Sequence, residues 1–237
     1  RIMMNTLRNN AENSKSKMNS VHTEKIGSVS QELQELRSSL PDIDKMKFGF
    51  DNSALHKGKI LFTANDLNFS YDTQPLWTEN LNFKITSGER IALKGKIEPQ
   101  TGKVYRADNK SVYIDQDYSL IDDKLKVYEQ AEQFNTSALQ EHEIKIRLNR
   151  FLFTKEDWDK SCNALSGGEK MRLMLCCLTI NNQSPDIIIL DEPTNNLDIQ
   201  NIEILTRAIN EYRGTLIVVS HDETFLEQTN IERTIQL

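Results

Sequence analysis

Two short segments of this sequence carry residue types that are suited to phosphate chemistry. Residues 165–169 are Leu-Ser-Gly-Gly-Glu, a glycine turn that should open a helix, and backbone N–H groups at a helix N-terminus hold phosphate oxygens. Residues 187–192 form an apolar run that ends in the adjacent carboxylates Asp191 and Glu192. One carboxylate at a strand end can hold Mg²⁺, and the next can orient or deprotonate a water molecule. Together with His221, which follows a later apolar run, these segments predict nucleotide hydrolysis.

The overall composition excludes several classes of protein. With 237 residues, 38% of them hydrophobic, the chain is long enough to bury a core. It contains no run of about 18 apolar residues that would span a membrane and no basic-then-apolar secretion pattern at its N-terminus. The net charge of −6 argues against a protein that binds nucleic acid with its whole surface. We therefore expect a cytoplasmic protein, whose cysteines are small core side chains and not disulfides or metal ligands: Cys162, Cys176 and Cys177.

Residues 1–47 differ from the rest of the chain, because they are polar and contain no strand-like run. Within them, apolar residues recur at spacings of three and four, which places them on one side of a helix that Pro41 ends. We predict a helical arm with a mildly basic tip, and a solvated linker that touches nothing is the alternative. Because the chain begins at Arg1 and not at Met, we expect it to be part of a longer protein. The apolar residues of the arm are Ile26, Val29, Leu33, Leu36 and Leu40.

From residue 59 onward the pattern changes to short strands separated by turns. Residues 104–106 and 111–114 are expected to pair around a turn at Asp108-Asn109. Helices are expected within 127–152 and over 169–180 and 199–211. The sequence predicts an α/β fold that combines a parallel sheet, a smaller antiparallel β region and a helical subdomain. The remaining predicted strands are 60–63, 67–71, 81–85, 90–93, 187–190 and 216–220.

These segments resemble the nucleotide-binding domain of ATP-binding-cassette (ABC) proteins, which has a P-loop NTPase fold. The likeness covers about residue 59 to the C-terminus. Residues 165–169 match the family signature, and Asn195–Asp198 matches its D-loop. In this family Ser166, Gly167 and Gly168 serve the ATP of the opposite domain in a head-to-tail pair, so we expect a single domain to hydrolyse ATP poorly.

The same resemblance implies roles for individual residues toward ATP and Mg²⁺. Asp191 matches the Walker B aspartate that binds Mg²⁺, and Glu192 matches the general base for water. His221 matches the switch histidine that contacts the γ-phosphate, while Gln116 matches the Q-loop glutamine that contacts Mg²⁺ and the attacking water. Tyr71 stands where an aromatic side chain stacks on adenine, although a plain core or edge aromatic is the alternative there. The signature and D-loop matches add the nucleotide contacts Ser166, Gly167, Gly168, Glu169 and Asp198.

Within this family the chain resembles the ABC-F subgroup, whose members carry two such domains joined by a helical linker and have no membrane part. Residues 192–198, Glu-Pro-Thr-Asn-Asn-Leu-Asp, and the arm before the domain carry this likeness. It implies the C-terminal half of a ribosome-associated protein that adjusts translation or protects the ribosome from antibiotics. The implied parts are a linker over 1–47 and a nucleotide-binding domain over 59–237. The implied partners are a second ABC domain and, through the linker, the ribosome with its rRNA and tRNA.

One expected element is missing from the sequence. A phosphate-binding loop of the form GxxxxGK[ST] should lie between a strand and a helix. Gly102-Lys103 is two positions too far from Gly95 for that loop, and Val104 follows it where a hydroxyl is required. We assign Gly102-Lys103 to a turn, so roughly 20 residues of loop and helix are absent between positions 96 and 97.

Two explanations for this gap stay open. Either the sequence lacks residues that the protein contains, or a genuine deletion leaves a nucleotide-binding-deficient domain. Two alternatives to a ribosome-associated ATPase also stay open. One is the nucleotide-binding subunit of a membrane transporter, and the other is a non-catalytic ABC module.

Overall fold

The computed structural model describes residues 48–50, 55–71, 74–94, 100–181 and 183–236. They belong to one compact unit of the chain, Lys47–Leu237. The predicted helical arm over residues 1–47 lies outside the described residues.

A sheet of five parallel strands forms the centre of this unit, in the order β10-β5-β9-β8-β7. The predicted apolar runs become its middle strands, and Ile188, Leu216 and Val218 have no exposed surface. Because the strands are parallel, their carboxyl ends lie at one edge of the sheet, where ligands bind in open α/β sheets. The strand bounds are β5 Arg90–Lys94, β7 Ser111–Ile114, β8 Ile187–Asp191, β9 Thr215–Val219 and β10 Arg233–Gln236.

A second sheet of three antiparallel strands has the order β4-β1-β6, and a two-stranded sheet pairs β2 with β3. The prediction of two separate strands at 60–63 and 67–71 is wrong, because the single strand β1 runs without a break over Ile60–Asn68. An irregularity in the pairing of β1 lies at Asp66, whose φ of 54° is in the left-handed region. The other bounds are β2 Ser70–Tyr71, β3 Gln74–Pro75, β4 Leu81–Thr86 and β6 Thr101–Arg106.

The assignment of Gly102-Lys103 to a turn is also wrong, since both residues lie within β6. Gly102 has a φ of 101° and faces the irregular part of β1. A β-carbon at Gly102 would lie 2.6 Å from the carbonyl oxygen of Asp66. The glycine is therefore explained by a close approach of two backbones in the sheet.

The predicted pairing of residues 104–106 with residues 111–114 is wrong as well. Strand β6 pairs with β1, and β7 pairs with β8 in the parallel sheet. Between them the backbone N–H of Ala107 donates to the carbonyl oxygen of Leu61, while that of Lys110 donates to the carboxylate of Asp186. These hydrogen bonds anchor the segment that crosses from the antiparallel sheet to the parallel sheet. The predicted hairpin would instead have turned back within one sheet.

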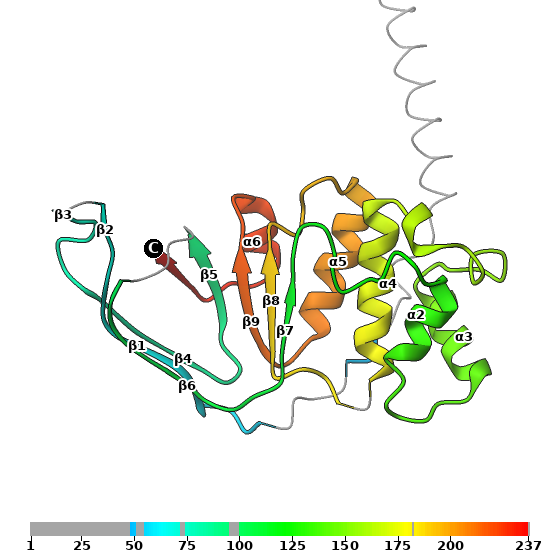
Figure 1. Cartoon of the computed structure of the whole chain (residues 1–237), viewed down its shortest axis with the longest axis horizontal. Helices are drawn as coiled ribbons and strands as arrows, with labels where there is room; N and C mark the ends of the chain where they lie inside the picture. Colours follow the sequence, from blue (N-terminus) through cyan, green and yellow to red (C-terminus); the bar gives the residue numbers. More distant parts are fainter. Residues whose placement is uncertain (1–47, 51–54, 72–73, 95–99, 182, 237) are drawn as a thin grey trace, which may run out of the picture. The chain divides into compact units, whose positions relative to one another are not determined.

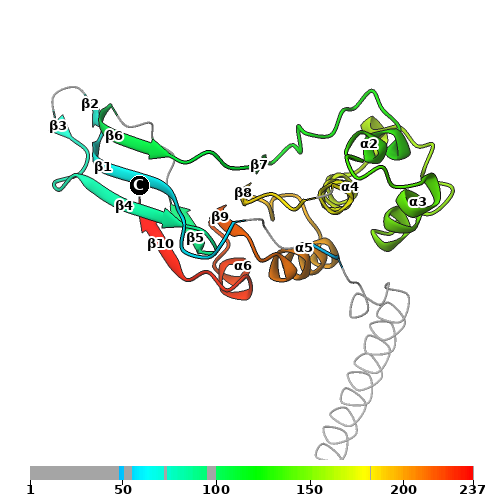
Figure 2. The ribbon, with the colours of Figure 1, turned by 90° about the horizontal axis from the view of Figure 1, so that it is seen from below.

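The helices lie on one side of the parallel sheet and the antiparallel strands on the other. Helices α4 and α5 both lie next to the parallel strands, and α2 and α3 lie beyond α4 (Figures 1 and 2). Helix α6 and strand β10 were not predicted, but the expected α/β class is confirmed. The helix bounds are α2 Val127–Gln133, α3 Glu141–Arg150, α4 Gly167–Ile180, α5 Ile199–Glu211 and α6 Glu223–Gln228, with a 3₁₀ turn at Cys162–Ala164.

The cysteines are core residues, as the sequence predicts. Cys176 and Cys177 lie on α4, Cys162 lies in the turn before it, and all three thiols are free and have no exposed surface. Burial raises the pKa of the Cys162 thiol to about 11 and raises the pKa values of the other two further.

Candidate functional site

The carboxyl ends of β8 and β9 bring together three of the predicted site residues. Asp191 is the last residue of β8, and its Oδ2 accepts a hydrogen bond from the hydroxyl of Tyr113 on β7. Glu192 follows with its backbone N–H donating to the carbonyl oxygen of Val219 at 2.8 Å. Its carboxylate Oε1 lies 3.6 Å from Nε2 of His221, which follows β9. The parallel register therefore places two carboxylates and an imidazole at one edge of the sheet.

Glu192 adopts an uncommon backbone conformation. Its φ of 48° lies in the left-handed region, which costs a non-glycine residue about 1 kcal/mol or more. The side chain of Glu192 is 22% exposed, whereas that of His221 is 87% exposed. Strain at an exposed edge of the sheet is typical of residues held for function.

Gln116 and Tyr71 are not brought to the carboxylates by any described contact. Gln116 lies in an exposed turn after β7 and, among the described residues, forms no hydrogen bond or ion pair. The same turn is fixed by the buried Tyr118, whose hydroxyl lies 3.5 Å from the carbonyl oxygen of Pro193. Tyr71 is in β2, which lies away from β8 in both views (Figures 1 and 2).

The predicted glycine turn does open a helix. Ser166 is the N-cap of α4, and its hydroxyl accepts from the backbone N–H of Glu169 at 3.3 Å. In return the carboxylate of Glu169 accepts from the backbone N–H of Ser166 at 2.7 Å, which completes a capping box. Although burial raises the pKa of the Glu169 carboxyl, hydrogen bonds from Lys160 and Ser166 outweigh it and lower that pKa. Gly167 remains exposed at the start of the helix.

The start of α4 packs directly on the start of α5. Asp198 is the N-cap of α5, and its Oδ1 accepts from both the backbone and the side-chain amide of Asn201, at 2.8 and 2.9 Å. The side-chain oxygen of Asn201 accepts from Arg172 on α4 at 2.8 Å. Gly168 lies against this amide with no room for a side chain. The signature segment and the D-loop segment are therefore one packed structure.

Four further residues belong to this site and were not predicted from the sequence: Tyr113, Lys160, Arg172 and Asn201. Asn201 stands three residues after Asp198, the position from which an N-cap receives its hydrogen bond, and that spacing was a usable signal. Tyr113 contacts Asp191 across two neighbouring strands that are 78 positions apart in sequence, so no local pattern indicates this pair. Lys160 contacts Glu169 from the loop before α4, nine positions earlier.

The residues present fit Mg²⁺-ATP only in part. Carboxylate oxygens are the ligands that Mg²⁺ prefers, and Asp191 and Glu192 supply them. Within the described ranges, however, no group of three histidine, cysteine, aspartate or glutamate side chains could hold a metal by itself, so phosphate oxygens would have to complete the site. Only residues 95–100 separate β5 from β6, which is too short for an eight-residue phosphate loop and a helix. The segment that joins β5 to β6 is therefore too short to supply the expected cradle for the triphosphate.

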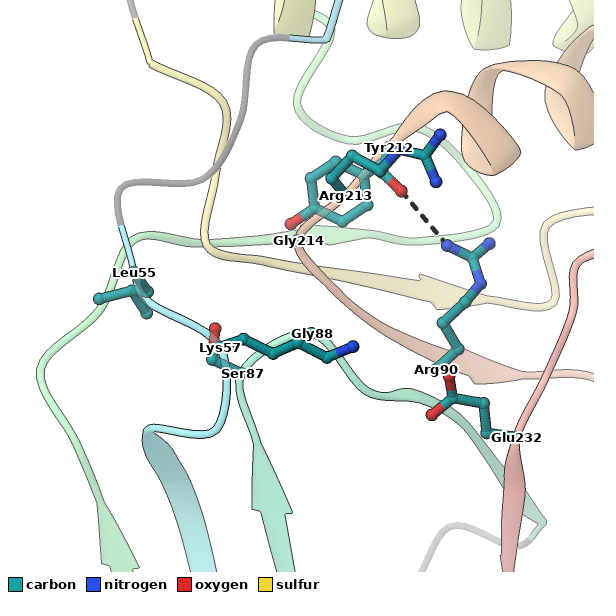
Figure 3. Close-up of a pocket in the computed structure, with 9 residues that line it drawn as sticks. All are labelled: Leu55, Lys57, Ser87, Gly88, Arg90, Tyr212, Arg213, Gly214 and Glu232. Atoms are coloured by element: carbon teal, nitrogen blue, oxygen red, sulfur yellow. Dashed lines mark hydrogen bonds between the residues drawn. The ribbon is translucent and has the colours of Figure 1, made fainter.

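A polar pocket of about 370 Å³ lies at the opposite edge of the parallel sheet, around the first residue of β5 (Figure 3). It contains none of the predicted site residues. Arg90 donates there to the carbonyl oxygens of Thr229, Ile209 and Tyr212, at 2.8, 3.2 and 3.4 Å. Burial lowers the pKa of Arg90, and the carbonyl groups replace the water that burial removes. The guanidinium thereby joins the ends of α5 and α6 to β5, a role in stability.

Comparisons with known proteins agree with this fold. A model of the family described as "ABC transporter" matches residues 91–195. YdiF of Bacillus subtilis is 33% identical over 214 residues, which cover 84% of this chain and 33% of YdiF. ABC transporter F family member 2 of Arabidopsis thaliana is 31% identical, over 81% of this chain and 30% of its own. ATP-binding protein Uup of Buchnera aphidicola is 30% identical, over 83% of this chain and 36% of its own.

Solved structures show the same fold at low sequence identity. The ATP-binding cassette MJ0796, solved as a dimer bound to ADP and Pi, has a TM-score of 0.53 at 20% identity, over 75% of this chain and 94% of its own. A bacterial Atm1-family ABC exporter with ATP bound has a TM-score of 0.57 at 16% identity, over 79% and 39%.

The fold and these matches define the chain as an ABC-type nucleotide-binding domain. Its relatives place it more narrowly, because they include Uup and members of the plant ABC transporter F family. The chain belongs to the ABC-F type of ABC proteins. It spans about a third of the length of the curated relatives that it matches.

Proposed function

We propose that this chain is part of a ribosome-associated ABC-F protein, in which two ABC domains close on ATP and move the segment that joins them. The observation that carries the proposal is the match to Uup and to an F family member, each about three times as long as the matched stretch. That length leaves room for a second domain of the same size. Within such a pair, Ser166, Gly167 and Gly168 would face the nucleotide of the other domain.

The composition of the arm over residues 1–47 supports contact with ribosomal RNA. Up to residue 25 its basic side chains outnumber the two carboxylates Glu12 and Glu24. Lysine and arginine bind the phosphates of nucleic acids largely without regard to sequence. In the part of the chain that the structure describes, no helix is long and apolar enough to cross a membrane. The basic residues of the arm are Arg1, Arg8, Lys15, Lys17 and Lys25.

Sedimentation with purified ribosomes through a sucrose cushion tests this proposal. We expect the chain to pellet with ribosomes and the pelleted fraction to fall as salt rises. Charge reversal of Lys15 and Lys17 to glutamate should weaken pelleting, and reversal of Lys57 and Arg213 at the polar pocket is the matched control. Failure to pellet at low salt, together with recovery in the membrane fraction of cells, would favour the transporter alternative.

A further inference from the structure

An apolar cavity of about 410 Å³ lies between the antiparallel and the parallel sheet. It is open to solvent along part of its wall, where Val104 is exposed. Its walls come from both sheets and are mostly aliphatic and aromatic side chains. They include Phe62, Phe83, Leu93, Val104, Ile189 and Ile217.

The alternation of side chains along β8 connects this cavity to the carboxylates. Ile187 and Ile189 line the cavity. The residues that alternate with them, Ile188 and Leu190, are buried on the other face of the sheet. Asp191 continues the series that faces the cavity. An element that packed in the cavity would therefore have one of its two ends beside Asp191.

Side chains around the cavity are less covered than their positions in the sheets predict. Leu93 and Ile189, on inner strands of the parallel sheet, are only partly buried although they pack on the core. Val104 on β6 is 52% exposed. Both sheets thus present an apolar face that no other described element covers.

The chain is also shorter than its relatives within the matched stretch. The alignment with YdiF spans 214 positions, but 84% of 237 residues is only about 199, so about 15 positions of YdiF have no counterpart. The same comparison gives about 18 for the Arabidopsis protein, since 81% of 237 is about 192 of 210 positions. These unmatched positions, taken together as one helix, would be about 23–27 Å long, enough to cross a sheet.

We propose that the cavity is the packing site of an amphipathic helix that would follow β5, that this chain lacks the helix, and that Asp191 and Glu192 therefore hold no nucleotide of their own. Both β5 and β8 end at the same edge of the sheet, so such a helix would begin beside the carboxylates and run down over the aliphatic face. Its first N–H groups would be the phosphate cradle that the site lacks. This inference concerns the domain's own nucleotide site and does not rest on ribosome binding.

Equilibrium dialysis with radiolabelled ATP and Mg²⁺, together with thermal unfolding, tests the proposal on three proteins. The first is the chain itself. The second carries an insertion between Lys96 and Ile97 of a GxxxxGKS loop and a helix with one aliphatic face, roughly 20 residues in all. The third is the same insertion with its loop lysine changed to alanine. We expect no saturable binding by the chain and saturable binding by the insertion variant. The lysine-to-alanine control should bind about tenfold or more weakly, because a lysine–phosphate bond is charge-assisted.

In the absence of ATP, both insertion variants should unfold at a higher temperature than the chain, because the inserted helix fills the cavity. Saturable Mg²⁺-ATP binding by the chain that Asp191→Asn abolishes would overturn the proposal. So would a folded insertion variant that is less stable than the chain or that binds no ATP.

A second measurement covers an insertion that fails to fold. The chain should bind an apolar fluorescent dye, and Val104→Phe, which points into the cavity, should lower that fluorescence about twofold as it occupies part of the space. Lys103→Phe on the other face of β6 is the matched control and should leave it unchanged. Equal effects of the two substitutions would show that the cavity is not the apolar site and would overturn the proposal.

Discussion

A β-carbon at Gly168 would lie 2.2 Å from the side-chain nitrogen of Asn201, closer than any two such atoms can approach. Asn201 cannot turn away freely, because its amide is bonded to both Asp198 and Arg172. The contact joins α4 to α5, so the second glycine of the signature segment has a packing reason that is independent of any nucleotide. Gly167, one residue earlier, would place a β-carbon at an ordinary 3.8 Å from the carbonyl oxygen of Asn196.

These two glycines give a matched pair of substitutions. Gly168→Ala should lower the free energy of unfolding by about 1–3 kcal/mol, because it overpacks the contact between α4 and α5. Gly167→Ala should be neutral or should raise it by up to about 1 kcal/mol, since alanine favours the helix more than glycine. Urea unfolding followed by circular dichroism measures both. Equal destabilisation by the two variants would contradict the packing argument.

Tyr212 supports the carboxyl end of α5 through a buried hydrogen bond. Its hydroxyl donates to the carbonyl oxygen of Pro185 at 2.7 Å, and only 1% of the residue is exposed. Tyr212→Phe leaves that carbonyl without its partner and should cost about 1–3 kcal/mol of unfolding free energy. Tyr128→Phe is the control, because the Tyr128 hydroxyl reaches the exposed Glu132 at 3.3 Å. The prediction fails if the control is destabilised as much as Tyr212→Phe in chemical denaturation.

The sequence predicted the parallel core and the site at its edge because those features are local. A fully apolar run such as 187–190 is expected in an α/β fold as a strand that is buried on both faces. Asp191 and Glu192 follow that run directly in the sequence, so they must lie at its carboxyl end. The pairing of β6 could not be predicted in the same way. Strand pairing depends on which backbones approach one another, and the evidence for it is the bulge at Asp66 opposite Gly102. The partners of the carboxylates, such as Tyr113, were missed for the same reason.

The three thiols should be unreactive in the folded protein. They have no exposed surface, and burial raises their pKa values, so little thiolate is present at neutral pH and none is accessible. We expect a chromogenic disulfide reagent to label no cysteine in native protein at pH 8 and all of Cys162, Cys176 and Cys177 in denaturant. Rapid labelling of any one of them without denaturant, located by mass spectrometry, would show that the core around α4 opens in the native state.

The capping box of α4 should make the free energy of unfolding depend on pH in the acid range. The pKa of Glu169 is lowered in the folded protein, so its carboxylate contributes stability that is fully present above the unfolded value of about 4.5. That contribution is lost as the pH falls through the lower pKa of the folded state. Unfolding midpoints in urea should therefore differ between the native chain and Glu169→Gln at pH 7, and the difference should shrink below pH 4.5.

Lys160→Met provides the control for this dependence. Lys160 lies 2.7 Å from the Glu169 carboxylate, so its removal should raise the pKa of Glu169 toward the unfolded value and reduce the pH dependence. Ser166→Ala should act in the same direction but should also remove the N-cap, at a cost of about 1 kcal/mol at every pH. A difference between the chain and Glu169→Gln that stays constant from pH 7 to pH 3 would mean that Glu169 acts on α4 by packing and not by charge.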